Sequence, residues 1–281
     1  MRDLLELSLS ATASGCIYGL VALAYLLMIR PTGIINFAVG EWAMVGAFAG
    51  FLLLSKFEWP YLVGMAAILA FMLLVGWATE RIALRPLAER GAPLLAPILA
   101  LLGMLVVFRE SISLGFGPDP YQVPEPVDFQ YLKYFMIGTT LVVFAGTWLF
   151  FEKTTMGKAF EAVSINRRAA ALVGINLSRV TAASFAGGAA AAGLAGLLVA
   201  PNISAHYVMG VPLAIQGFTA LVVGGVGRVE GALLGGLLLA FAEQLTVRYA
   251  PVPSGYAQGV PLLLLMVFLL VRPTGLLRAR A

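Results

Sequence analysis

The sequence predicts an all-α, polytopic integral membrane protein with about nine transmembrane helices. Of its 281 residues, 60% are hydrophobic and only 11% are charged, whereas a soluble domain carries about 25% charged residues to solvate its surface. Apolar runs of membrane-crossing length recur along the whole chain, without the strict alternation of barrel strands. We therefore expect residues 1–281 to form a single membrane domain.

Charges, prolines and glycines separate nine apolar runs, and about 20 residues of helix cross the ~30 Å hydrocarbon core of a bilayer. The predicted spans are residues 5–29, 35–54, 60–80, 93–116, 131–151, 180–200, 212–227, 231–250 and 255–271. The first is long enough to be a retained span rather than a cleaved signal peptide. The seventh is short and ends in glycines, so eight complete crossings and one broken helix are an alternative.

The distribution of Lys and Arg predicts the orientation, because cytoplasmic loops are enriched in them. With nine alternating spans and a cytoplasmic C-terminus, thirteen basic residues fall on the cytoplasmic side and four outside. The external segment 117–130 carries three acids and no base. We expect the N-terminus outside and the C-terminus in the cytoplasm. The sequence pI of about 9.3 then reflects topology and contact with the lipid membrane, and no nucleic-acid partner is expected.

Residues 153–179 form the longest predicted cytoplasmic segment. The segment is too polar to insert into lipid, and its Ala, Leu, Arg and Glu residues favour helix. We expect one or two short helices over residues 156–172, ended by Gly174. Such a segment is either a docking surface for a cytoplasmic partner or a plain connector.

A few polar residues lie within the predicted spans, where each charge costs ~2.5–3.5 kcal/mol at the helix centre unless it is paired or faces a cavity. Glycine-rich stretches either pack helices closely or act as hinges along a pathway. Asn36 and Gly40, four residues apart, are expected on one helix face beside Glu41. The candidates for a translocation pathway or helix interface are Asn36, Gly40, Glu41, Arg109, Glu110, Gln216, Gly224, Gly225, Gly227 and Glu243.

Enzyme chemistry is not expected. His206 is the only histidine and Cys16 the only cysteine, so neither a His-paired metal site nor a disulfide can be built within the chain. No catalytic residue, metal or bound cofactor is therefore predicted.

Several motifs occur in order along nearly the whole chain. They are RPTGIINFAVGE at 30–41, ER at 80–81 with RPL at 85–87, GFG at 115–117, a pattern at Ala162, Asn166, Ala170, Gly174, Ile175 and Asn176, a glycine-rich stretch at 224–236, and RPTGLL at 272–277. Together they resemble the branched-chain amino-acid ABC transporter permeases, H-type subunits of a group that also includes urea and ribose-type permeases.

The resemblance implies an importer subunit of the bacterial inner membrane, working with a second homologous permease, two cytoplasmic ATPase subunits that bind ATP and Mg, and an external solute-binding protein. Closure of the ATPases would drive alternating access, with the seventh and eighth spans tilting against the second. The resemblance places coupling to the ATPase at residues 157–176. The residues implied are Gly157, Ala162, Asn166, Arg167, Ala170, Gly174 and Asn176.

The chain departs from the family pattern at Val39, where the family usually has histidine. This leaves the solute open among a branched-chain amino acid, another amino acid, a urea-like amide and a small organic acid. Whether two copies or two different permeases pair is also open. The alternative class is a self-sufficient secondary transporter of a small polar solute, driven by an ion gradient through Glu41, Arg109 and Glu110.

Overall fold

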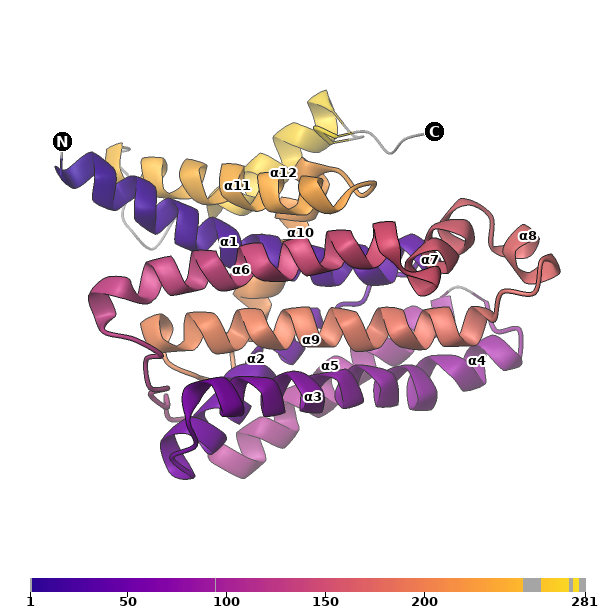
Figure 1. Ribbon diagram of the computed structural model, residues 1–281, viewed down its shortest axis with the longest axis horizontal. Coiled ribbons are helices and arrows are strands. Elements are labelled where there is room, and N and C mark those ends of the chain that lie inside the picture. Colours follow the sequence, from indigo (N-terminus) through magenta and orange to yellow (C-terminus); the bar gives the residue numbers. More distant parts are fainter. Residues whose placement is uncertain (1, 94, 250–258, 273–274, 278–281) are drawn as a thin grey trace.

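The structure is a computed structural model that describes residues 2–93, 95–249, 259–272 and 275–277, and the regular elements are helices. In chain order they are α1 Arg2–Thr32, α2 Val39–Gly50, η1 Phe51–Lys56, α3 Tyr61–Thr79, η2 Glu80–Leu84, α4 Arg85–Glu89, α5 Leu95–Phe116, α6 Phe129–Lys153, α7 Thr155–Ile165, α8 Arg167–Leu172, α9 Leu177–Ile203, α10 Gly210–Gly224, α11 Val229–Tyr249 and α12 Val260–Val271 (Figure 1). The two η elements are π-helical and continue α2 and α3.

The predicted all-α membrane class is confirmed. Within the described residues, seven helical runs are long and apolar enough to cross a membrane, and α10 and Pro261–Val271 are shorter apolar helices. Each lies where a predicted span was placed. Residues 250 and 255–258 of the last two predicted spans lie outside the described residues, as do Pro273, Thr274, Arg278 and Arg280.

The start of the second predicted span is wrong. Residues 33–38 are not helical, and the Asn36 side chain accepts a hydrogen bond from the Ala38 amide at 2.9 Å. Asparagine favours such local turns over helix because its side chain competes for backbone groups. Asn36 therefore does not share a helix face with Gly40, although both are buried.

Helix α9 lies at the centre of the fold and contacts α1, α2 and α3 (Figure 1). Where α2 crosses α9, Gly46 lies against the Gly193 backbone and Gly196 against the Ala43 backbone, so closely that a Cβ on Gly46 or Gly196 would collide. We call this contact the α2–α9 seam. Small residues allow such an approach in lipid, where helices gain little from hydrophobic attraction to one another.

Close packing also joins α1, α10 and α11. A Cβ on Gly15 would lie 2.7 Å from the Cα of Leu237, and one on Gly231 would lie 2.8 Å from the carbonyl oxygen of Gly224. Gly224 and Gly231 of the glycine-rich stretch are therefore in close backbone contact. Gly225, the residue after α10, has a φ of 98°. This conformation favours glycine and ends the helix.

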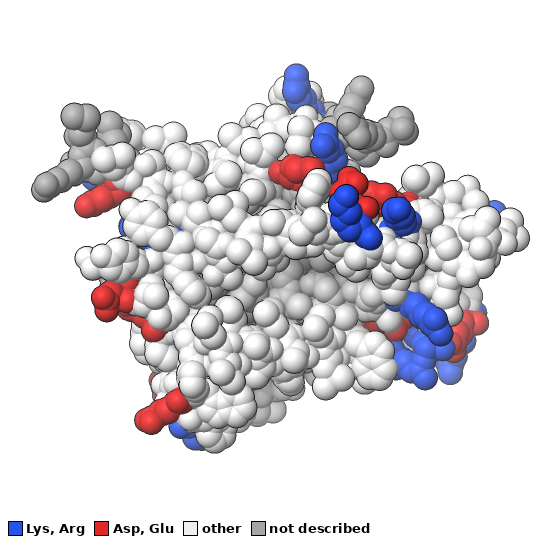
Figure 2. All heavy atoms as spheres, in the orientation of Figure 1, with Lys and Arg blue, Asp and Glu red and all other residues white. Residues whose placement is uncertain are grey.

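Two ends of the helix bundle differ in charge. At one end, which we call the basic end, the chain carries the residues Arg85, Arg90, Arg167, Arg168 and Arg179 on α4, α8 and their flanks. At the other, the bridge end, Tyr121 and Ala205 exchange backbone hydrogen bonds of 2.9 and 2.8 Å. Figure 2 shows a broad area without charged side chains between the ends, and basic side chains gathered beside α4 and α7–α8. An uncharged belt of this kind suits a lipid environment.

Candidate functional site

A buried ion pair joins α2 to α5. The carboxylate of Glu41 is 1% exposed and accepts a charge-assisted hydrogen bond from the Arg109 guanidinium, which is 26% exposed. Glu41 lies in the first turn of α2, where the free amides and the helix dipole favour a negative charge. The ion pair thus offsets the cost of burying two charges, which is high in a lipid environment.

The pair is incompletely satisfied and lies against α10. The second carboxylate oxygen of Glu41 and the Nε of Arg109 have no hydrogen-bond partner within the described residues. A Cβ on Gly210, the first residue of α10, would lie 2.8 Å from that free oxygen, and Gly40 packs on the Gly210 backbone. The carboxylate therefore lies where the first turns of α2 and α10 meet.

The other candidate residues of the spans do not join this pair. Glu110 is exposed on α5, and Gln216 is half-buried on α10. Glu243 of α11 accepts a 2.7 Å hydrogen bond from the Tyr18 hydroxyl of α1. Gly224, Gly225 and Gly227 lie at the turn from α10 to α11. Of the pathway candidates, Gly40, Glu41 and Arg109 are the ones that lie together at this contact in the described part of the chain.

At the basic end, a polar side chain caps the start of each of the helices α7, α8 and α9. The side chains of Thr154, Asn166 and Asn176 accept hydrogen bonds from the amides of Gly157, Ala169 and Arg179 at 2.9, 3.0 and 3.1 Å. Such N-caps satisfy amides that a helix start leaves free. Gly174 has a φ of 87°, and of the one or two short helices expected before it the structure has two, α7 and α8.

Two of the residues that the resemblance assigns to ATPase coupling are not exposed. Ala170 is 3% exposed, and Gly157 is buried against the backbone of Phe150 and Phe151. Small size permits close contact but does not say with which partner. For Ala170 the expectation of an exposed surface is wrong, whereas Ala162 is half-buried, and Asn166, Arg167, Gly174 and Asn176 are exposed.

Helices α7 and α8 and the residue after them also expose three large apolar side chains, beside charged ones such as Arg167 and Arg168. Ile165, Leu172 and Val173 are 86%, 89% and 77% exposed, and we call these three residues the apolar patch. Sequence reasoning missed them, although an Ile and a Leu-Val pair in a polar segment are a readable signal. Large apolar side chains grouped on a polar end usually mark a protein interface.

An aromatic cluster ties α7 to the membrane helices. The rings of Phe150, Phe151 and Phe160 meet edge to face at 5.5 to 5.8 Å between centroids, and the Arg30 guanidinium of α1 lies 5.3 Å from the centroid of Phe151. Arg167 reaches α1 as well, donating a hydrogen bond to the Pro31 carbonyl at 3.3 Å. Helices α7 and α8 are thus linked to both α6 and α1.

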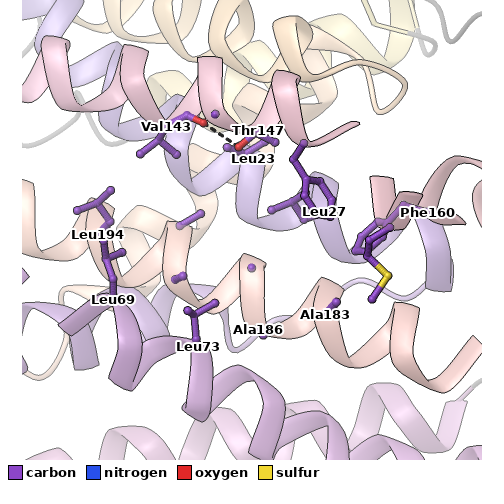
Figure 3. A pocket seen from close by; sticks show the side chains of 16 residues that line it. Leu23, Leu27, Leu69, Leu73, Val143, Thr147, Phe160, Ala183, Ala186 and Leu194 are labelled. Carbon is purple, nitrogen blue, oxygen red and sulfur yellow. Dashed lines mark hydrogen bonds between the residues drawn. The ribbon is translucent and has the colours of Figure 1, made fainter. Parts of the chain in front are cut away.

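Beside this cluster lies an apolar cavity of about 590 Å³, bounded by α1, α3, α6, α7 and α9 (Figure 3). Its only side chain with a hydroxyl, Thr147, already donates to the Val143 carbonyl at 2.8 Å. Leu73 and Leu27 enter it from opposite helices, as Figure 3 shows. No lining group is left to bind a charged solute, so this cavity is a gap between helices rather than a polar site.

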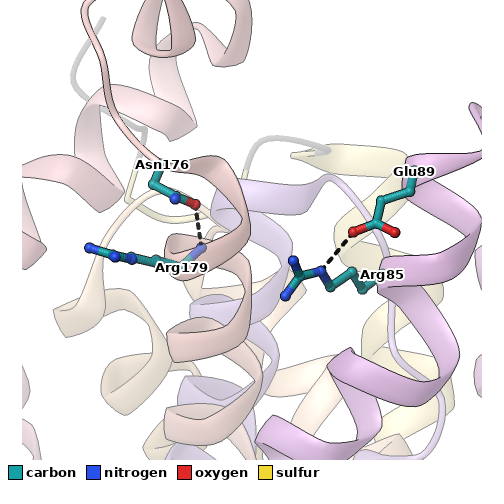
Figure 4. Close-up of polar contacts among 4 residues, drawn as sticks. All are labelled: Arg85, Glu89, Asn176 and Arg179. Atoms are coloured by element: carbon teal, nitrogen blue, oxygen red, sulfur yellow. Dashed lines mark hydrogen bonds and ion pairs between the residues drawn. The ribbon is translucent and has the colours of Figure 1, made fainter.

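An ion pair lies on the side of α4 that faces α9. Arg85 pairs with Glu89 at 2.8 Å, and Figure 4 shows its guanidinium on the side of α4 that faces the start of α9, where Asn176 caps Arg179. The described residues contain no group of three His, Cys, Asp or Glu side chains that could hold a metal ion.

Comparisons with known proteins give this geometry a context. Residues 8–269 match the family described as "Branched-chain amino acid transport system / permease component". The chain is 31% identical to the high-affinity branched-chain amino acid transport system permease protein LivH of Salmonella typhimurium, over 94% of this chain and 92% of that protein. It is 30% identical to the permease protein BraD of Pseudomonas aeruginosa, with the same coverage.

Two more distant likenesses fit the same picture. The ribose import permease protein RbsC of Escherichia coli is 28% identical over 79% of this chain and 72% of its own. A solved structure, PsaBC from Streptococcus pneumoniae in complex with Fab, superposes with a TM-score of 0.54 at 10% identity, covering 94% of this chain and 91% of the other. This second likeness concerns the fold alone.

A self-sufficient secondary transporter belongs to a different class of protein from these relatives. The family match spans nearly all the membrane helices, including Glu41 and Arg109. The chain therefore belongs to the family of branched-chain amino acid transport system permease components: it is a multi-pass membrane subunit of an ABC-type transporter and is not itself an enzyme.

Proposed function

We propose that this chain imports branched-chain or closely related amino acids across a bacterial inner membrane, powered by ATPase subunits that carry the ATP and Mg. The observation that carries this proposal is the family match over residues 8–269. The names of LivH and BraD, both similar along almost their whole length, point to the same solute class. Val39, in place of the family histidine, is the position at which a different solute preference would arise.

In this proposal the basic end faces the cytoplasm. Its five arginines support that orientation, because basic residues are retained on the cytoplasmic side during insertion. The bridge end, next to the acidic loop 117–128, then faces outward and receives the solute-binding protein. Helix α10 has 15 residues, which span about 22 Å, less than the ~30 Å of a bilayer core. The turns on either side of α10 would therefore have to complete the seventh crossing for the total to be nine.

The ATPase subunits are proposed to dock on the apolar patch. Ile165, Leu172 and Val173 project from the basic end, where water would otherwise surround them. The neighbouring Arg167 and Arg168 are exposed and give the patch a positive rim that suits an acidic groove. The exposed helix α5, of which only Pro97 and Leu101 are buried, is the surface offered to the second permease.

Movement would pass from α7 through the phenylalanine cluster to α6 and α1. The apolar cavity leaves α6 without close contact to α9 at that level, so α6 and α7 have room to shift. At the other end of the path, α10 and α11 would tilt against α2. Glu41 and Arg109 lie at that contact, and their unpaired atoms would meet the solute or water as the helices part.

The function is tested by reconstituting the whole transporter into vesicles that enclose ATP, with binding protein and labelled solute outside. We expect ATP-dependent accumulation of leucine, isoleucine or valine in preference to urea and small organic acids. Uptake driven by an ion gradient without ATPase subunits, or selective uptake of a solute outside the amino acids, would contradict the proposal.

The docking surface is tested separately by replacing Ile165 and Leu172 with aspartate. Because both side chains are more than 80% exposed, the permease should still fold, while two carboxylates buried at the contact should expel the ATPases. We expect co-purified ATPase to fall at least about tenfold, a loss of roughly 1.4 kcal/mol or more. Val127→Asp, the same change at the bridge end, should retain it. Normal retention in the double variant would overturn the docking proposal.

A further inference from the structure

A second, polar cavity opens at the basic end. It has a volume of about 390 Å³ and lies between the ends of α1 and α9, the η2–α4 segment and the start of α5. Its polar lining includes Glu80, Arg85, Arg167 and Thr181. This volume falls within the range of sites that hold small ligands, which is roughly 300–1,000 Å³.

Glu80 is the unusual member of the lining. It is 3% exposed, yet among the described residues no hydrogen bond or ion pair reaches its carboxylate; Arg85 acts on it only through its nearby charge. The oxygens of this carboxylate are not among the fully enclosed unpartnered atoms of the described residues, so they are open to a ligand in the cavity that Glu80 lines. Glu80 also opens the π-helical segment η2, and π-helical turns occur frequently at functional sites.

The two arginines add the opposite charge. Arg85 uses its Nε to bind Glu89, and Arg167 uses one terminal nitrogen to bind the Pro31 carbonyl. A guanidinium has five N–H donors, so each arginine keeps further donors for a ligand. The cavity is thus lined by two acids, Glu80 and the Arg85-paired Glu89, and by the two arginines, together with the hydroxyl-bearing residues Thr32, Ser178 and Thr181.

We propose that this cavity is a release site that binds the zwitterionic head of an α-amino acid, with the ammonium group on Glu80 and the carboxylate on Arg85 and Arg167. The inference rests on the function and orientation proposed above. Helix α5 connects the two polar regions of the chain: Pro97 lines the cavity, and Arg109 pairs with Glu41 twelve residues later, about 18 Å along the helix axis. A solute leaving the Glu41 region would reach this cavity before the cytoplasm.

A release site predicts inhibition of uptake by solute on the cytoplasmic side. Vesicles of the complete transporter are loaded with ATP and graded concentrations of leucine, and uptake of labelled leucine from outside is measured. For the unaltered protein we expect luminal leucine to slow uptake. We expect no such effect from 4-methylpentanoate, which lacks the amino group, or from isoamylamine, which lacks the carboxylate, because the cavity needs both charges.

In Glu80→Gln, the luminal leucine needed for half-inhibition should rise at least about tenfold, while half-saturation by external leucine stays the same. Glu152→Gln, which neutralises an exposed carboxylate on α6, is the matched control and should behave like the unaltered protein. An unchanged inhibition constant in Glu80→Gln, or inhibition by 4-methylpentanoate alone equal to that by leucine, would overturn the release site.

The Glu80→Asp variant covers the case in which Glu80→Gln does not assemble. It keeps the charge and shortens the side chain by one methylene. We therefore expect a smaller rise in the luminal leucine concentration needed for half-inhibition, and an unchanged concentration would refute the release site. Failure of the release site differs from failure of the proposed function, because the latter shows as absent ATP-dependent leucine uptake in the unaltered transporter.

Discussion

Helix α9 meets its neighbours in two contrasting ways. Against α2 it is separated by nothing but glycine and alanine backbone, through Gly46, Gly193 and Gly196. Against α6 it is separated by the apolar cavity of about 590 Å³, to which Gly146, Leu194 and Ala190 contribute. Both contacts involve the same central helix. The contact with α2 is packed to the van der Waals limit, whereas the contact with α6, which we call the open contact, is separated by the cavity.

The difference indicates which parts of the molecule move together. Tightly packed interiors behave as rigid bodies, because shifting one backbone against another loses contacts or creates overlap. We therefore regard α2 and α9, joined at the seam, as one frame, and α6 with α7 as an arm that carries the docking patch. An ATP-driven movement at α7 would then change the open contact and leave the seam in place.

The largest expected effect comes from forcing the seam apart. In Gly46→Leu the new side chain would meet the Gly193 backbone, which cannot yield as a flexible side chain could, so the cost should exceed the ~1–3 kcal/mol of ordinary overpacking. Most of the protein should fail to fold, as measured by monodisperse yield in detergent. Gly138→Leu on α6, where a Cβ has no neighbour within 4 Å, should keep its yield; equal yields for both would refute a tight seam.

A smaller but selective effect is expected where the seam helix α2 meets α10. Glu41→Gln keeps the size of the side chain and removes its charge, so yield should hold while uptake falls at least about tenfold, equivalent to 1.36 kcal/mol. Glu243→Gln is the comparison: it keeps an oxygen to accept the Tyr18 hydrogen bond and should change uptake less than about twofold. Loss of the Glu41→Gln protein itself would assign the pair a purely structural role.

The open contact should respond most mildly. Gly146→Leu places a side chain into the cavity, where nothing lies within 4 Å of the new Cβ, so thermal stability should stay the same or rise slightly. If α6 needs this space to move, uptake per bound ATPase should fall about threefold to tenfold, an effect of roughly 0.6–1.4 kcal/mol. Gly138→Leu, two turns earlier on the same helix, is the control and should leave uptake normal. Normal uptake in Gly146→Leu as well would show that α6 does not need the cavity to move.

Much of the fold was readable from the sequence, because a membrane crossing depends on length and hydropathy, both local properties. The site was readable only as a list of residue types. Glu41 and Arg109 were both candidates, but their pairing across 68 positions depends on how α2 and α5 pack. Gly157 illustrates the same limit: its small size signals a close neighbour, and only the structure identifies that neighbour as α6.

Two other residues, Asn36 and Glu80, behave in ways that the sequence did not predict. Asn36 lies in an apolar run, but its side chain binds the Ala38 amide and keeps the chain out of helix until Val39. Glu80 stood in a recognised motif without an assigned role, because nothing in the sequence indicates that its carboxylate is buried beside a cavity. Sequence patterns do not determine the role of a residue when that role depends on which side chains of other helices lie against it.

The most direct test of the frame-and-arm account is a pair of distances measured by electron spin resonance in the reconstituted transporter. Cys16 is first replaced by serine, and labels are attached at Leu74 and Leu149, exposed on α3 and α6, or at Ser55 and Ile203, beside α2 and on α9. When ATP is trapped on the ATPase subunits, the Leu74–Leu149 distance should change by more than about 2 Å, the scale of helix shifts in switching proteins, and the Ser55–Ile203 distance should not. Equal changes in both distances, or a change confined to Ser55–Ile203, would contradict the account.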